Sequence, residues 1–229
     1  FLASHDGIGL NPLRGILPES EILSLVEKLQ HEGALVNWKN NPDGTRSPYE
    51  INVTYLDALS TRDCNDNQRV ARFILAHAVL LSFPGVPAVY IQSILGSRND
   101  YEGVKRLGYN RAINRAKYVA GQIDGALENK NSLRYQVYSA LSRLIALRRM
   151  EKAFHPDSEA YFSTSGSAIL KITRVAASGE KITAIFNFSE RAQTVQSDIS
   201  VGRDLIAGNV ITDTTLTLTP WQVLWIKEN

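Results

Sequence analysis

Three groups of residues have side chains suited to chemistry on a polar substrate. His5-Asp6-Gly7 follows a short apolar run, Arg111 lies in a basic stretch with Arg115, and Tyr49-Glu50 lies in a polar segment. A carboxylate in a water-poor pocket can stabilise positive charge that develops in a transition state. The planar fork of an arginine can bind two oxygens in fixed geometry. Each group also has a plain structural interpretation, because Asp is common in turns and charged loops are ordinarily solvated.

Several other kinds of site are not indicated. His31, His77 and His155 have no Cys or acidic partner at metal-ligand spacing, so we expect no metal. The sequence contains no Gly-rich phosphate loop and no Ser-His-Asp arrangement, and nothing in it implies a cofactor. His77 has Leu75 and Ala78 close by in an apolar helical stretch, which favours a core histidine.

The overall composition limits the partners that the chain can have. A net charge of +2 gives no indication of nucleic acid or of an anionic membrane surface. No window reaches ~18 apolar residues, so we expect no membrane span. A single cysteine, Cys64, excludes an intrachain disulfide and favours a reducing compartment, the cytoplasm.

The first two-thirds of the chain reads as the end of an alternating α/β architecture. Apolar residues at helical spacing predict helices from Pro18 to Gly33, from Asp66 to about Phe83 and from Ser132 to about Met150. Residues 1–4 resemble a strand end, and 34–60 reads as mostly irregular. The apolar run 86–91 predicts a strand buried on both faces, followed by a long loop over roughly 92–130, of a length typical of functional or disordered loops.

Near residue 155 the apolar spacing changes from a helical period to a period of two. This pattern predicts an antiparallel β domain with strands at 161–162, 168–172, 182–188, 216–218 and 223–226. We therefore divide the chain into an α/β domain, 1–154, and a β domain, 155–229. Trp221 and Trp225 alternate with apolar residues in the last strand, which favours packing within the domain.

Two segments carry a resemblance to the α-amylase superfamily. Ala3-Ser4-His5-Asp6-Gly7-Ile8-Gly9 resembles the conserved region at the C-terminal end of the seventh barrel strand, and 83–90 resembles the region around the eighth. The resemblance implies the C-terminal part of a (β/α)8 TIM barrel, about strands seven and eight with their helices, followed by a small antiparallel β domain. Catalytic groups in such barrels come from the C-terminal ends of strands.

Within the superfamily, the chain resembles the sucrose-phosphorylase-like group. Segment 47–55 is similar to the mobile acceptor-site loop of these enzymes, and 111–115 is similar to a segment that follows their eighth strand. Sucrose phosphorylases have Gln where this chain has Glu50, and Asp where it has Ala112. At these two positions the chain is more similar to the glucosylglycerate phosphorylases and the sucrose-6-phosphate phosphorylases.

The resemblance implies a retaining phosphorylase that transfers glucose between a small glucoside and inorganic phosphate, giving α-glucose 1-phosphate. Asp6 would stabilise the oxocarbenium-like transition state, while His5 and Arg111 would bind hydroxyls of the glucosyl ring. The acceptor remains open between glycerate, fructose and fructose 6-phosphate.

Tyr49 and Glu50 would line the mobile loop that binds the acceptor. Because Glu50 would repel phosphate, Arg46 and Arg14 are the candidate cations for phosphate. Glu50 could equally be an exposed loop carboxylate with no role.

The superfamily's nucleophile Asp and general acid Glu lie on the fourth and fifth strands, which the resemblance places before Phe1. We therefore expect a fragment that is inactive alone and is stable only beside the missing N-terminal part or as a homo-oligomer. Two other interpretations remain: an α-glucosidase-type hydrolase built on the same barrel, and a non-catalytic fragment.

Overall fold

A computed structural model describes residues 1–228. The chain divides into two compact units. The first comprises Phe1–Phe73 and Ala88–Tyr138, and the second comprises Ile74–Pro87 and Ser139–Asn229. The predicted division at residue 154 remains a prediction. Within residues 1–228, no helix has the length and apolar character needed to cross a membrane.

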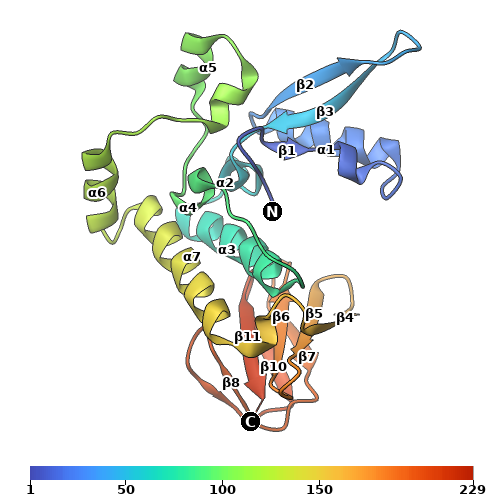
Figure 1. Ribbon diagram of the computed structural model, residues 1–229, viewed down its shortest axis with the longest axis vertical. Helices are drawn as coiled ribbons and strands as arrows, with labels where there is room; N and C mark the ends of the chain where they lie inside the picture. Colours follow the sequence, from blue (N-terminus) through green and yellow to red (C-terminus); the bar gives the residue numbers. More distant parts are fainter. Residues whose placement is uncertain (229) are drawn as a thin grey trace. The chain divides into compact units, whose positions relative to one another are not determined.

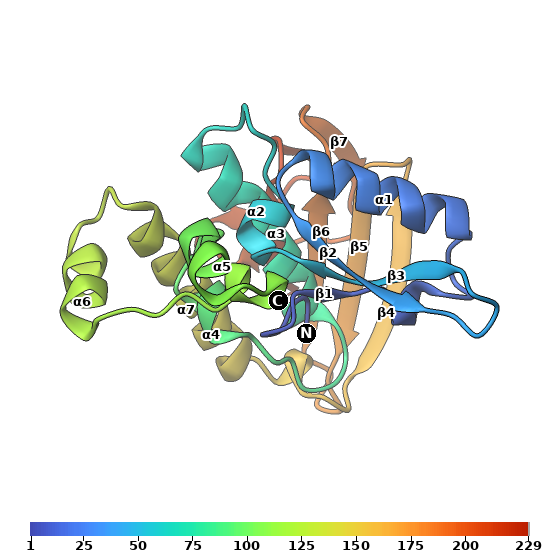
Figure 2. The same ribbon diagram turned by 90° about the horizontal axis from the view of Figure 1, so that it is seen from above.

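The first unit contains a small antiparallel sheet with strand order β1-β3-β2 (Figure 1). Its strands are β1 (Ile8–Gly9), β2 (Leu35–Asn40) and β3 (Arg46–Asn52). Helix α1 (Glu19–His31) contacts β2 and β3 and runs alongside their hairpin (Figure 2). The shared core consists of buried apolar side chains from the helix, the sheet and the adjoining turns: Leu10, Ile22, Val26, Leu29, Ala34, Val36, Ile51 and Val53. This core fixes the sheet against the helix.

The β2–β3 hairpin contradicts the expectation that residues 34–60 are mostly irregular. At the tip of the hairpin, the Asn41 amide donates to the Thr45 carbonyl at 2.8 Å, and Gly44 has a φ of 83°. Two features hide the strands from pattern analysis. The register shifts between Asn37 and Trp38. Pro48 interrupts the alternation of β3 and lies outside the pairing with β1, which covers only Glu50 and Ile51.

Helices and 3-10 turns make up most of the remaining first unit. The three predicted helices are confirmed as α1, α3 (Asp66–Ser82) and α7 (Leu133–Met150), of which α3 and α7 contribute residues to both units. The predicted loop 92–130 is wrong, because it contains short helices and a 3-10 turn. The elements not yet placed are η1 (Asn11–Leu13), α2 (Tyr55–Ala58), α4 (Ile91–Ile94), α5 (Tyr101–Leu107), η2 (Asn110–Asn114) and α6 (Ala120–Glu128).

Two strands expected from apolar runs are absent within residues 1–228. Ser4 and Gly7 form an isolated bridge, and 86–90 has no strand pairing. Val86 is 85% exposed, so this run is not buried on both faces. A parallel strand obtains its hydrogen bonds from neighbours, and no described strand lies beside either run.

The second unit is built on antiparallel sheets, as the sequence predicts. A six-stranded sheet has the order β4-β5-β6-β11-β8-β9, and β10 pairs with β7 (Figure 1). A 3-10 turn, η3 (Lys152–Phe154), precedes the strands β4 (Glu159–Ser165), β5 (Ile169–Val175), β6 (Lys181–Asn187), β7 (Gln193–Gln196), β8 (Gly202–Asp204), β9 (Val210–Ile211), β10 (Thr215–Leu218) and β11 (Val223–Glu228). Trp225 is fully buried against Phe154, with ring centroids 4.7 Å apart, so its predicted packing role is confirmed. The sequence missed β7, β8 and β9, which are too short to show an alternating pattern.

Candidate active site

Asp6 lies in a tight turn that is pressed against β3. The amides and carbonyls of Ser4 and Gly7 bond to each other at 3.0 and 3.1 Å, and the Asp6 amide donates to Ser4 Oγ at 3.2 Å. Gly7 has a φ of 102°, and a Cβ added there would lie 2.2 Å from the Ile51 carbonyl oxygen. Only glycine allows both this conformation and this close approach. The turn therefore fixes where the Asp6 carboxylate emerges.

The Asp6 carboxylate is surrounded by cationic or potentially cationic groups. Arg115 Nη2 donates to its Oδ1 at 2.8 Å. Arg111 Nη1 lies 3.2 Å and His5 Nε2 lies 3.3 Å from the same oxygen. The side chains of Asp6 and Arg111 are each 35% exposed. The described residues therefore gather three of the predicted site residues into one cluster that is open to solvent.

Arg111 is held by Glu50 in a two-point ion pair. Arg111 Nε donates to Glu50 Oε1 at 2.9 Å, and Nη2 donates to Oε2 at 2.7 Å. These hydrogen bonds are the main reason that the pKa of Arg111 is raised above its usual range. Glu50 is only 4% exposed, so the interpretation of Glu50 as an exposed loop carboxylate is wrong.

A set of asparagine amides surrounds this ion pair. Asn37 Nδ2 donates to Glu50 Oε1 at 3.1 Å, and Asn52 Nδ2 donates to the same oxygen. Asn52 also donates to the Asp6 carbonyl at 2.8 Å. Asn110 on η2 donates to Asn37 Oδ1 at 3.0 Å. Strands β2 and β3, the Asp6 turn and η2 are thus joined by one polar network, which the sequence did not indicate because its members lie far apart along the chain.

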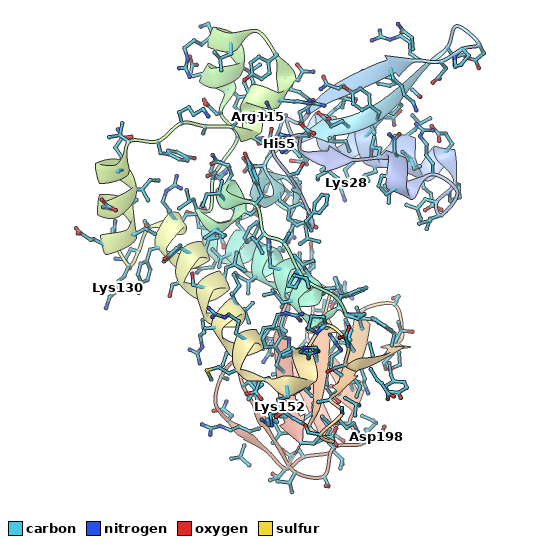
Figure 3. The ribbon with its side chains drawn as sticks, viewed as in Figure 1. His5, Lys28, Arg115, Lys130, Lys152 and Asp198 are labelled. Carbon is cyan, nitrogen blue, oxygen red and sulfur yellow. The ribbon has the colours of Figure 1, made fainter. Side chains whose placement is uncertain are left out.

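Arg115 is a site residue that the sequence analysis did not select. Besides its bond to Asp6, its Nε donates to the His5 carbonyl at 2.7 Å. Figure 3 labels both residues and shows them next to each other. The available signal was its position four residues after Arg111, at the end of the 3-10 turn η2.

Tyr90 is a second residue near the site that the sequence analysis did not select. Its hydroxyl donates to the Asn114 carbonyl at 3.1 Å. Its pKa is raised by burial, while Arg115 lowers it and Asp6 raises it. Because the charges of Arg115 and Asp6 both affect the pKa of Tyr90, this residue lies in the same electrostatic environment as Asp6.

The predicted acceptor loop is part of the β2–β3 hairpin, so the expectation of a loop at Tyr49 and Glu50 is wrong. Tyr49 is half-buried on β3, and its carbonyl accepts from the Leu10 amide at 2.9 Å. An electrostatic interaction with Tyr49 is the smallest of the causes that raise the pKa of Arg111. Tyr49 therefore lies close to the cluster while fixed in a strand.

The two candidate cations for phosphate have different surroundings. Arg14 is committed to the protein, because it pairs with Glu19 at 2.8 Å and donates to the Pro48 carbonyl at 3.0 Å. Arg46 is exposed at the start of β3. Within residues 1–228, no group of three or more His, Cys, Asp or Glu side chains could hold a metal ion.

Comparisons with known proteins find relatives that match almost the whole chain. No family model matches the chain. Over 227 residues, 99% of this chain and 41% of the relative, it is 64% identical to a glucosylglycerate phosphorylase of Escherichia coli. Over 187 residues, 79% of this chain and 35% of the relative, it is 32% identical to a sucrose phosphorylase of Streptococcus mutans.

A solved structure shows the same fold. The crystal structure of sucrose 6F-phosphate phosphorylase from Thermoanaerobacter thermosaccharolyticum matches 93% of this chain and 39% of that protein, with a TM-score of 0.65 and 23% identity. The expected fold class is therefore confirmed. The chain spans about two-fifths of the length of the curated relatives that it matches. From these identities, the chain belongs to the sucrose-phosphorylase-like group of the α-amylase superfamily.

Proposed function

We propose that this chain supplies the transition-state-stabilising carboxylate and part of the glucose subsite of a retaining glucoside phosphorylase. The reaction transfers glucose between a glucosylglycerate-type glucoside and inorganic phosphate, giving α-glucose 1-phosphate. One observation carries the proposal. His5 Nε2 and Arg111 Nη1 both lie close to the carboxylate oxygen Oδ1 of Asp6. The family resemblance assigns all three residues to the same sugar.

The chemistry assigns a distinct part to each of these residues. As the glycosidic bond breaks, positive charge develops on the glucosyl ring, and the Asp6 carboxylate stabilises it electrostatically. The two arginines on Oδ1 hold the carboxylate in place, so little reorganisation is needed during the reaction. The His5 side chain is 65% exposed, so a sugar hydroxyl has access to its ring. Tyr49 would border the acceptor side.

The rest of the catalytic apparatus belongs to the remaining three-fifths of such a protein. A retaining reaction needs a nucleophilic carboxylate and a general acid about 5 Å apart, and we propose that both come from that part. The same part would cover the open face of Asp6 and Arg111, which excludes water and strengthens the electrostatic effect. Its absence would leave the chain inactive and dependent on self-association. The buried free thiol of Cys64 fits a reducing, cytoplasmic setting.

An acceptor screen tests the proposal. The protein in which this chain occurs is supplied with α-glucose 1-phosphate and, in turn, glycerate, fructose or fructose 6-phosphate. We expect phosphate release with glycerate well above that with either fructose compound. Release with fructose 6-phosphate alone would assign the other subgroup, and no release with any acceptor would refute the proposed function.

A further inference from the structure

The carboxylate of Glu50 is used entirely within the protein. We propose that Glu50 is a positioning residue that orients the Arg111 guanidinium toward the glucosyl ring, and that it is not a ligand of the acceptor. This inference rests on the proposed function. It departs from the sequence-based expectation that Glu50 receives hydrogen bonds from an acceptor hydroxyl.

The acceptor capacity of Glu50 is already taken. Its Oε1 accepts hydrogen bonds from Arg111 Nε, Asn37 Nδ2 and Asn52 Nδ2, and its Oε2 accepts from Arg111 Nη2. A carboxylate offers about four lone-pair sites. Four donors match this number, and with 4% of Glu50 exposed an incoming hydroxyl has little access to the carboxylate.

The two hydrogen bonds from Arg111 leave a defined part of its guanidinium available. Arginine carries five N–H donors in a rigid planar fork, and Glu50 takes the side-on pair on Nε and Nη2. Nη1 also lies 3.2 Å from Asp6 Oδ1, in an ion pair. The end-on pair of N–H groups on Nη1 and Nη2 takes no part in the two-point pair with Glu50. Such a pair matches two neighbouring hydroxyl oxygens on a sugar.

The same network also fixes Asp6. Asn52 is fully buried and donates both to Glu50 Oε1 and to the Asp6 carbonyl. Without the Glu50 carboxylate, Asn52 would lose one of its two hydrogen-bond acceptors. The Asn52 side chain could then shift and disturb the backbone at Asp6, which is its other acceptor. The expected defect therefore lies in the handling of the glucosyl ring, before any acceptor is bound.

The variant Glu50→Gln separates the two roles. The Gln side chain has the same size, but its amide NH2 group replaces one of the two oxygens that accept from Arg111. The NH2 group cannot accept a hydrogen bond, so the two-point pair is lost. The donor α-glucosyl fluoride reports the first half-reaction alone, because its kcat/KM does not depend on the acceptor. With the protein that carries this chain, we expect kcat/KM for α-glucosyl fluoride to fall roughly 10- to 100-fold, with an unchanged kcat/KM for glycerate. An unchanged kcat/KM for α-glucosyl fluoride together with a lowered kcat/KM for glycerate would overturn the proposal.

Two further variants complete the design. Glu102→Gln changes an exposed carboxylate on α5 and should leave both parameters as in the wild type. If Glu50→Gln does not fold, Asn37→Ala removes one donor to Glu50 and should lower kcat/KM for α-glucosyl fluoride in the same direction by a smaller factor. Full activity of Asn37→Ala toward α-glucosyl fluoride would then contradict the proposal.

A spectroscopic readout keeps the inference independent of turnover. In protein labelled with ¹⁵N-arginine, the Arg111 Nε–H resonance is assigned by its loss in Arg111→Lys. We expect this signal to shift and to exchange faster with water in Glu50→Gln. If the Arg111 signal is the same in Glu50→Gln and in the wild type, the positioning role is refuted even in an active enzyme. If the wild-type protein is inactive on every donor, only the proposed function is refuted.

Discussion

Asp6 carries the chemical proposal at the scale of single residues. It contributes charge and position, because both arginines contact its Oδ1. In the protein that carries this chain, Asp6→Asn keeps the shape but removes the charge, so we expect kcat to fall roughly 100- to 1,000-fold with unchanged thermal stability. Initial rates of phosphorolysis measure the effect. Asp157→Asn, at a 92% exposed position, is the matched control. Equal activity of Asp6→Asn and wild type would remove Asp6 from the mechanism.

The sequence predicted some of these residues and missed others for a physical reason. His5, Asp6 and Arg111 were found because short motifs carry them. The burial of Glu50 was misjudged, since burial and pairing depend on residues brought in from other elements. Arg115 was missed because a second arginine in a basic stretch looks like a solvated charge until the Asp6 turn is placed beside it.

Gly7 carries a prediction at the scale of elements, because it lets the Asp6 turn lie against β3. In Gly7→Ala the new Cβ would collide with the Ile51 carbonyl, and φ would be strained. We expect both a lower melting temperature and a loss of turnover, since the turn must move away from β3. At Gly9, whose φ is not positive, an added Cβ would meet only Pro12, at 4.0 Å. Gly9→Ala should therefore be close to wild type in thermal melting and rate assays. Similar behaviour of the two variants would refute this account of the turn.

Strand β11 carries a second prediction at this scale. Lys227 binds Glu151 Oε2 at 2.6 Å and Glu180 Oε2 at 2.9 Å. The hydrogen bonds that Lys227 donates to Glu151 and Glu180 raise its pKa above the usual 10.5. Burial acts to raise the pKa of Glu180, but the bond from Lys227 and the Ala153 amide together lower it below 4.5.

The sign of the pH dependence follows from these shifts. The stabilisation is fully present between about pH 4.5 and 10.5. It is lost as the pH falls through the lowered pKa of Glu180 or rises through the raised pKa of Lys227. Because Lys227 is partly exposed, Lys227→Met should reduce the free energy of unfolding by only about 1 kcal/mol at pH 7. Urea denaturation should show a smaller difference at pH 3.5, and an equal or larger difference there would contradict the pairing.

Elements with long, regular patterns were predicted correctly, and those that depend on context were not. Helices α1, α3 and α7 repeat apolar residues at helical spacing over several turns. The β2–β3 hairpin escaped because a register shift and Pro48 break its alternation. The run 86–90 has the composition of a buried strand. A strand forms only where a neighbouring strand pairs with it, and composition does not reveal whether such a neighbour is present.

At the scale of the whole molecule, the chain corresponds to about two-fifths of its relatives. Its fold class was predictable because motif order and the change of period near residue 155 are both visible in the sequence. We propose that the choice between phosphate and water as the final acceptor depends on residues outside this chain, so no short segment of it predicts that choice.

The most direct test of the central claim follows the fate of the glucosyl group by NMR. The protein that carries this chain is incubated with glucosylglycerate, with and without inorganic phosphate. The account predicts α-glucose 1-phosphate with retained anomeric configuration when phosphate is present, and little free glucose when it is absent. Free glucose formed at the same rate in both samples, or a β-configured product, would contradict it.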